Sequence, residues 1–95
     1  MISLVEAMLL LRGWEGRRVR VVFKSDAVKV GASGTLSDVV GTKVAFLITE
    51  GDGFEVDLEG CAVDFSDRAP ETREFDEAIG AIREDFNLTV CLFKD

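Results

Sequence analysis

Three acidic side chains recur at alternate positions of one segment, an arrangement that could support acid–base or cation-binding chemistry. Glu55, Asp57 and Glu59 are separated by Val56 and Leu58, so in a strand they would project from one face. Acid–base catalysis needs one carboxylate desolvated beside another, with their pKa values pushed apart. The outward face of a half-exposed strand is normally hydrated. We therefore interpret this acidic stripe as a solvated face, with a weak divalent-cation site as the alternative.

The second group with chemical potential is a basic cluster near the N-terminus: Arg17, Arg18, Arg20, Lys24 and Lys29. Arg18, Arg20 and Lys24 would share one face of a strand, so a phosphate or RNA groove is one hypothesis. The alternative is cross-strand pairing with the acidic stripe, which stabilises a sheet modestly. We favour pairing, because the chain has no tyrosine and few aromatic residues accompany the cluster for base stacking.

The thiols offer little chemistry. Cys61 and Cys91 lie too far apart in sequence for a metal clip, and the chain has no histidine. A nucleophilic cysteine generally needs a histidine, a neighbouring cation or a helix N-terminus to lower its pKa. We expect two reduced thiols packed as small hydrophobes. We also expect no metal, no cofactor and no enzyme activity.

Length and charge limit the function classes further. The 95 residues, 47% of them hydrophobic, predict a single domain over 1–95. A chain this short buries only roughly 60% of its unfolded surface, which favours self-association as a supplement. The net charge of −7 repels phosphate backbones. The apolar run Ile2–Leu11 contains Glu6 and is too short to span a bilayer, so we expect a cytoplasmic protein that enters no membrane.

The elements that must position these residues are read from periodicity. Ser3 and Glu6 form a capping-box pattern and predict a helix over 3–12, ended by a left-handed Gly13. Alternation from Arg17 to Phe23 predicts a strand. After a glycine-punctuated loop over 30–34, short strands are expected over 35–39, 43–49, 54–59 and 62–65, with a hairpin turn at 51–53.

Five short strands in so few residues must curl into a small barrel. Pro70 marks the start of a second helix over 70–86, whose apolar residues recur at helical spacing. The tail 88–93 is predicted to be a sixth strand. The expected fold is mainly β with flanking helices: an N-terminal helix and a small five-stranded barrel over 3–66, then a helix–strand extension over 67–95.

Two stretches resemble the signatures of the Sm-like (Lsm) family. Gly34-Thr35-Leu36 follows the first predicted strand as the family's first signature does, and Leu58-Glu59-Gly60-Cys61-Ala62-Val63-Asp64-Phe65 is similar to the second. The resemblance implies a glycine-bent barrel. It also implies homo-oligomerisation, in which strand 54–59 of one subunit pairs with strand 61–66 of the next to close a ring.

The family's RNA-reading residues are not reproduced. The Asp and Asn of the first signature have no counterpart in 40–44, and the usual Arg before the glycine of the second is Glu59. The resemblance thus implies the scaffold without the RNA contacts. The positions that would line a residual nucleic-acid site are Thr42, Lys43, Gly60 and Cys61.

Three functions are compatible with these residues and patterns. The leading one is a non-catalytic, oligomeric Sm-like binding or assembly module. The alternative is an SH3-like monomer or dimer that docks peptides or proteins through the loops 24–34 and 50–53. The third is RNA binding through the 40–43 turn and the 59–61 junction, which the acidic charge disfavours.

Overall fold

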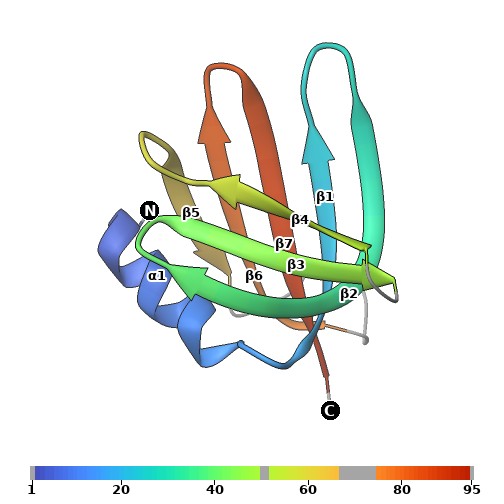
Figure 1. Ribbon diagram of the computed structural model, residues 1–95. Coiled ribbons are helices and arrows are strands. Elements are labelled where there is room, and N and C mark those ends of the chain that lie inside the picture. Colours follow the sequence, from blue (N-terminus) through green and yellow to red (C-terminus); the bar gives the residue numbers. More distant parts are fainter. Residues whose placement is uncertain (1, 50–51, 67–74, 95) are drawn as a thin grey trace.

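One antiparallel sheet of seven strands, curved around a short helix, makes up the fold in the computed structural model, which describes residues 2–49, 52–66 and 75–94 (Figure 1). The strand order is β4-β3-β2-β1-β7-β6-β5. The elements are α1 (Leu4–Gly13), β1 (Arg18–Lys24), β2 (Lys29–Val40), β3 (Lys43–Thr49), β4 (Asp52–Asp57), β5 (Ala62–Ser66), β6 (Phe75–Arg83) and β7 (Phe86–Phe93).

The long strand β2 gives the sheet its curvature. Residues 29–35 of β2 pair with β1, whereas 35–40 pair with β3. The register shifts between Leu36 and Asp38, so a bulge lies where β2 passes from one neighbour to the other. In Figure 1 the strand runs down beside β1 and then sweeps across the front of the molecule. The predicted loop over 30–34 is therefore wrong, and these residues belong to one bent strand.

The core fills the concave side of the sheet. Val19 and Val21 of β1 lie beside Val90 and Leu92 of β7 in register, and all four are buried. Helix α1 contacts β5 and β2 and adds Ala7, Met8 and Leu11 to the same core, which Trp14, the residue after the helix, also joins. Alternation along each strand thus sends apolar side chains inward, where the helix covers them.

The predicted first helix is confirmed, with a different ending. Glu6 N–H donates to Ser3 Oγ at 3.1 Å, and the Ser3 hydroxyl in turn donates to Glu6 Oε1 at 3.2 Å. The helix ends at Gly13, which does not take a left-handed conformation; Gly16 does, at φ 81°, and its N–H donates to Leu36 O. That hydrogen bond joins the turn after α1 to the bend of β2.

The predicted second helix over 70–86 is wrong. Residues 75–83 form β6 and 86–93 form β7, while the expected start at Pro70 lies outside the described residues. The apolar residues of 75–83 fit both the strand period and the helix period. Ile79 and Ala81 point inward from a strand, and they also fit a helical stripe. Gly80 disfavours a helix by roughly 1 kcal/mol relative to alanine. Pairing with β7 on one side and β5 on the other then selects the strand.

The five-stranded barrel with a C-terminal helix is also wrong, because the sheet is open and has seven strands. The β6–β7 hairpin lies between β1 and β5, so β5 is placed at the far edge from β4. The tail strand pairs with β1 and β6 and caps neither edge. Only a four-residue connection, 58–61, joins the two edge strands.

A hairpin joins β3 to β4 near 51–53, as predicted. Gly53 is required there because of its close packing, not because of a turn conformation. Gly53 lies within β4 opposite Leu47, and its φ is not positive. A Cβ at this position would collide with the backbone carbonyl of Phe46. The missing side chain lets β4 close tightly on β3.

We predict that Gly53→Ala destabilises the fold by about 2 kcal/mol, because a rigid backbone carbonyl must move to admit the methyl group. Gly80→Ala is the matched control, since no atom lies within 4 Å of the added Cβ and φ is ordinary. Urea unfolding should show a lower midpoint for Gly53→Ala alone. Equal midpoints for the two variants would contradict the close approach.

Candidate functional site

The residues predicted to line a nucleic-acid site lie in two turns that the fold brings together. Thr42, in the turn between β2 and β3, donates its hydroxyl to Asp57 Oδ1 at 2.7 Å. Leu58 N–H donates to the Thr42 carbonyl at 2.9 Å, and Lys43 stands opposite Asp57 in the β3–β4 register. Gly60 and Cys61 follow in the connection to β5. The two turns therefore lie together as predicted for a shared site, but the carboxylate of Asp57 lies between them.

Asp57 is held in its charged form at this point. Its Oδ1 also accepts a hydrogen bond from Glu59 N–H at 3.0 Å. The hydrogen bond from Glu59, then that from Thr42, lowers the pKa of Asp57 below its ordinary value, and Lys43 and Arg83 act in the same direction. A fixed negative charge repels phosphate, so this site is unsuited to a nucleic-acid backbone.

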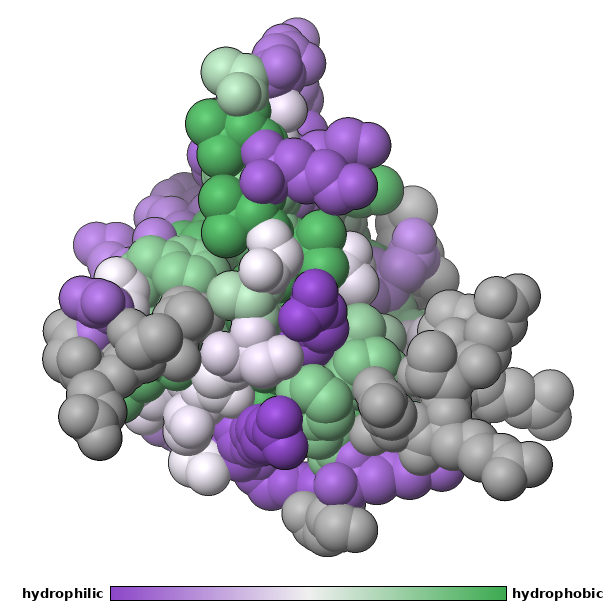
Figure 2. Space-filling view, turned by 90° about the vertical axis from the view of Figure 1, so that its right-hand side faces the viewer, coloured by the Kyte–Doolittle hydropathy of each residue, from purple (hydrophilic) through white to green (hydrophobic). Residues whose placement is uncertain are grey.

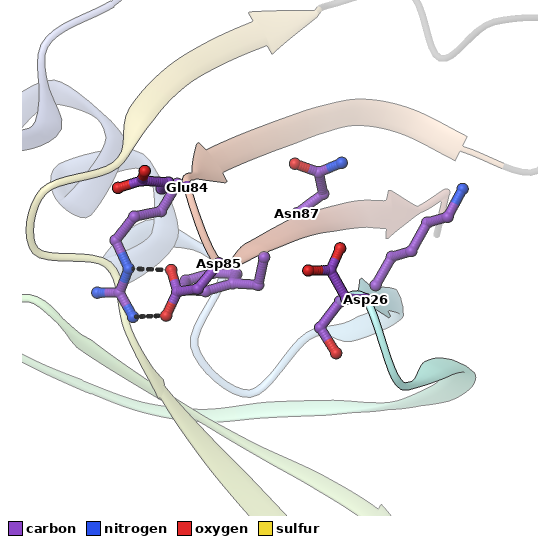
Figure 3. Close-up of a pocket in the computed structure, with 8 residues that line it drawn as sticks. Asp26, Glu84, Asp85 and Asn87 are labelled. Carbon is purple, nitrogen blue, oxygen red and sulfur yellow. Dashed lines mark hydrogen bonds and ion pairs between the residues drawn. The ribbon is translucent and has the colours of Figure 1, made fainter.

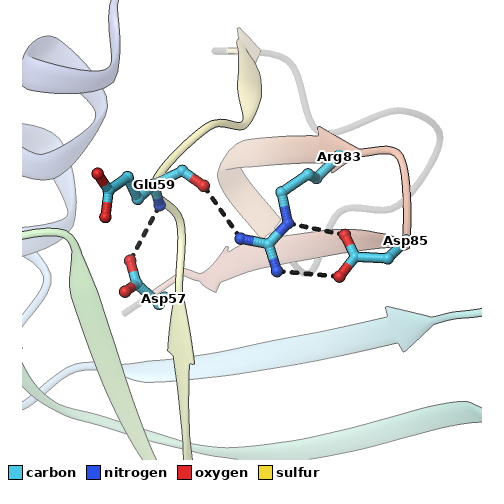
Figure 4. Close-up of polar contacts among 4 residues, drawn as sticks. All are labelled: Asp57, Glu59, Arg83 and Asp85. Atoms are coloured by element: carbon cyan, nitrogen blue, oxygen red, sulfur yellow. Dashed lines mark hydrogen bonds and ion pairs between the residues drawn. The ribbon is translucent and has the colours of Figure 1, made fainter.

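Arg83 ties the connection 58–61 to the turn between β6 and β7 (Figure 4). Its Nε and Nη2 donate to the two carboxylate oxygens of Asp85 at 2.7 and 3.1 Å, and its Nη1 donates to the Glu59 carbonyl at 3.0 Å. The guanidinium also lies 4.5 Å from the ring centroid of Phe86. The hydrogen bond between Asp85 and Arg83 lowers the pKa of Asp85 and raises that of Arg83. Sequence reasoning missed this cluster because it placed Arg83 in a helix.

Both cysteines are free thiols, half-buried rather than fully buried. Partial burial raises the pKa of Cys61 and of Cys91, which disfavours the reactive thiolate. Among the residues that the structure describes, no group of three or more cysteine, aspartate or glutamate side chains is arranged to hold a metal ion.

A small pocket of about 150 Å³ separates the tip of the β1–β2 hairpin from the β6–β7 turn (Figure 3). Asp26, Glu84, Asp85 and Asn87 line it, together with Lys24 and Arg83. Asp85 is already paired with Arg83 through both oxygens. The pocket is too small for a small-molecule site of the usual 300–1,000 Å³.

A larger apolar depression of about 350 Å³ lies between the β1–β2 hairpin and β4. We call it the β4 groove; it is lined by Phe23, Val30, Phe54, Glu55 and Val56. Val30 is 46% exposed, and Val28 at the hairpin tip is 49% exposed. Figure 2 shows apolar side chains running down from the top of this side of the molecule, where the hairpin ends. Val30, which lines the groove, belongs to the segment 24–34 from which the sequence predicted protein docking.

Beside the β4 groove, the outer edge of β4 has no strand partner among the described residues, because β4 pairs only with β3. An edge strand presents backbone donors and acceptors to any extended chain that approaches it. Glu55 is exposed on this edge strand and also lines the groove. Backbone hydrogen bonding, apolar contact and negative charge are therefore available at one place.

The basic cluster and the acidic stripe do not meet. Arg18 and Arg20 lie on β1, and two strands, β2 and β3, separate them from Glu55 and Asp57 on β4. The predicted cross-strand pairing of the two groups is therefore wrong. Among the described residues, Arg18 and Arg20 make no ion pair; Arg18 stacks on Phe93, and Arg20 reaches Ser33 at 3.4 Å. Lys24 and Lys29 stand opposite each other at the far end of the hairpin.

We predict that Asp57→Asn lowers the urea midpoint at pH 7. The difference in midpoint between this variant and the parent chain should become smaller in acid. The hydrogen bonds lower the folded-state pKa of Asp57 below its ordinary value of 3.8. They therefore stabilise the fold above that value, and this contribution is lost as pH falls through the lower folded-state pKa. Urea titrations from neutral pH into acid would test this. Asp26→Asn, which removes an exposed carboxylate from the hairpin tip, is the control; a deficit for Asp57→Asn that is the same at every pH would contradict the prediction.

Comparison with known proteins identifies no relative. No family model, no curated protein and no solved structure matches the chain. The resemblance to the Sm-like family therefore stays a prediction from the two sequence signatures. No helix in the described part of the chain combines the length and apolar character needed to cross a membrane.

Proposed function

We propose that the protein is a non-catalytic binding module that takes an extended segment of a partner protein along β4. The observation that supports this most directly is the β4 groove lying next to a strand edge without a partner among the described residues. A segment added to such an edge gains backbone hydrogen bonds along its whole length. Its alternate side chains would enter the groove, which supplies specificity.

The aromatic residues of the groove are held in place by packing, so the groove is formed before a partner binds. Phe54 packs against Phe46, with ring centroids 5.1 Å apart, and Phe46 is buried. Phe23 stacks on Phe86 with centroids 5.4 Å apart. Aromatic pairs of this kind hold both walls against the core, so the site loses little conformational freedom when a partner binds.

The charge of the site indicates the chemistry of the partner. Glu55 is exposed at the groove, and the chain as a whole carries −7. A basic segment would be attracted and an acidic one repelled. We therefore expect a partner segment in which apolar residues alternate with lysine or arginine.

Self-association is the second candidate, favoured because the two strands predicted to pair between subunits, 54–59 and 61–66, lie at the two edges of the sheet. The apolar residues Val5 and Leu9 of α1, which are 71% and 62% exposed, could extend such an interface. Both edge strands, however, carry an exposed carboxylate, Glu55 on β4 and Asp64 on β5, and like charges placed opposite each other across strands are destabilising. Ile2 N–H also occupies the Val63 carbonyl of β5.

We predict that a labelled peptide of alternating valine and lysine binds the protein and that Val30→Asn weakens binding roughly tenfold, the effect of losing about 1.4 kcal/mol of apolar contact. Glu55→Lys should weaken binding and reduce its dependence on salt. Fluorescence anisotropy measures both effects. Native mass spectrometry of the protein alone reports whether copies assemble.

Val40→Asn is the matched control, because Val40 is also an exposed valine of β2 but lies away from the groove, beside the turn to β3. Equal losses for Val30→Asn and Val40→Asn would refute the groove as the site. Equal binding of a peptide in which valine alternates with glutamate would refute the charge argument. A discrete ring mass would favour self-association instead.

A further inference from the structure

The outer face of the sheet, on the side away from the core, carries a second surface with distinct chemistry. We call it the basic face; it is lined by Arg18, Arg20, Ser33, Phe75, Phe93 and Lys94. These residues surround an open depression of about 580 Å³, within the range of small-ligand sites. The face belongs to β1, β2, β6 and β7, and none of its residues lines the β4 groove.

Alternation along β1 creates the cationic part of the face. Val19 and Val21 point into the core, so Arg18 and Arg20 point outward from the same side of the strand. Residues two apart in a strand are separated by roughly 6.6 Å. At that spacing one phosphate group can lie between two guanidinium groups and accept hydrogen bonds from both.

The cations of this face are not neutralised within the described part of the chain. Arg18, Arg20 and Lys94 have no carboxylate partner there. Arg20 makes one long hydrogen bond, to Ser33 Oγ at 3.4 Å, so most of its donors are available to a ligand. Within the described residues, cations that lack a carboxylate partner concentrate positive potential on this face of a chain whose net charge is −7.

Aromatic rings lie directly beside these cations. Phe75 and Phe93 stand opposite each other in the β6–β7 register, with ring centroids 4.7 Å apart and planes tilted by 45°. The Arg18 guanidinium lies over the Phe93 ring at 4.5 Å. Such a stack fixes the guanidinium plane and leaves its outer side to receive a planar group. Sequence reasoning missed this aromatic component because Phe75 was placed in a helix.

We propose that the basic face binds nucleotides, with the phosphate held between Arg18 and Arg20 and the base stacked at the Arg18–Phe93–Phe75 array. The unit recognised is one or two nucleotides, free or within a single strand, because a long duplex would meet the acidic remainder of the surface. This site is separate from the proposed protein-binding groove, so either proposal can fail without the other.

The test is fluorescence anisotropy with a labelled oligouridylate of about ten nucleotides, competed by uridine monophosphate, inorganic phosphate and polyphosphate. We expect Arg20→Gln to weaken binding roughly tenfold and to reduce the slope of log affinity against log salt by about 0.7, the value for one lost phosphate contact on a single strand. Phe93→Leu should weaken binding of the oligonucleotide and leave binding of polyphosphate unchanged. Competition by uridine monophosphate would assign the site to free nucleotides, and failure to compete would assign it to single strands.

Lys29→Gln is the matched control, because it removes one exposed positive charge from the same hairpin outside the basic face. Urea midpoints of the charge variants should equal that of the parent chain, since Arg20 and Lys29 are exposed. The proposal is overturned if the oligonucleotide does not bind, if Lys29→Gln is as harmful as Arg20→Gln, or if polyphosphate competes equally per phosphate. Loss of binding in Lys43→Gln but not in Arg20→Gln would move the site to the 42–43 turn and also overturn it.

Discussion

The bend of β2 determines where the other elements lie. One strand pairs with β1 along its first half and with β3 along its second, and Leu36 is fully buried where the register shifts. Only the second half of β2 contributes buried side chains, Leu36 and Val39, and there β3 and β4 are carried over the concave side while the β1–β2 hairpin continues outward (Figure 1). The β4 groove is the space left between them. Its apolar lining is the continuation of the core toward solvent, which is why Phe23 and Phe54 are only partly covered.

An open sheet with two edges needs something to hold those edges in place. Here the connection 58–61 joins β4 directly to β5, with Gly60 at φ 83° making the turn. Asp57 and Arg83 fix this connection from its two sides, through the Glu59 N–H and the Glu59 carbonyl respectively. One end of the sheet is thereby tied, whereas Asp52 and Gly53, at the other end of β4, are exposed. The residues that resemble a family signature thus serve a structural role in this fold.

Local periodicity was sufficient for α1 and for most strands before β5, because each of those segments fits a single period. It failed for 75–83, where Ile79, Ala81 and Ile82 fit both a helix and a strand and only long-range pairing with β7 decides. Because of that error, the contacts made by Phe75 and Arg83 were not predicted. Phe75 and Arg83 acquire their neighbours, Phe93 and Phe86, from the β6–β7 pairing. By contrast, the basic cluster was recognisable in the sequence, because charge is a local property.

The strand order also explains why opposite charges remain apart. Two strands, β2 and β3, lie between β1 and β4 in the sheet, so neither Arg18 nor Arg20 stands beside a residue of β4 in register. The acidic edge and the arginine pair therefore do not neutralise each other, although the sequence suggested that they would. Arg18 is instead held on Phe93, an arrangement that orders the guanidinium without quenching its charge. The two proposed sites therefore carry charge of opposite sign on separate parts of the surface.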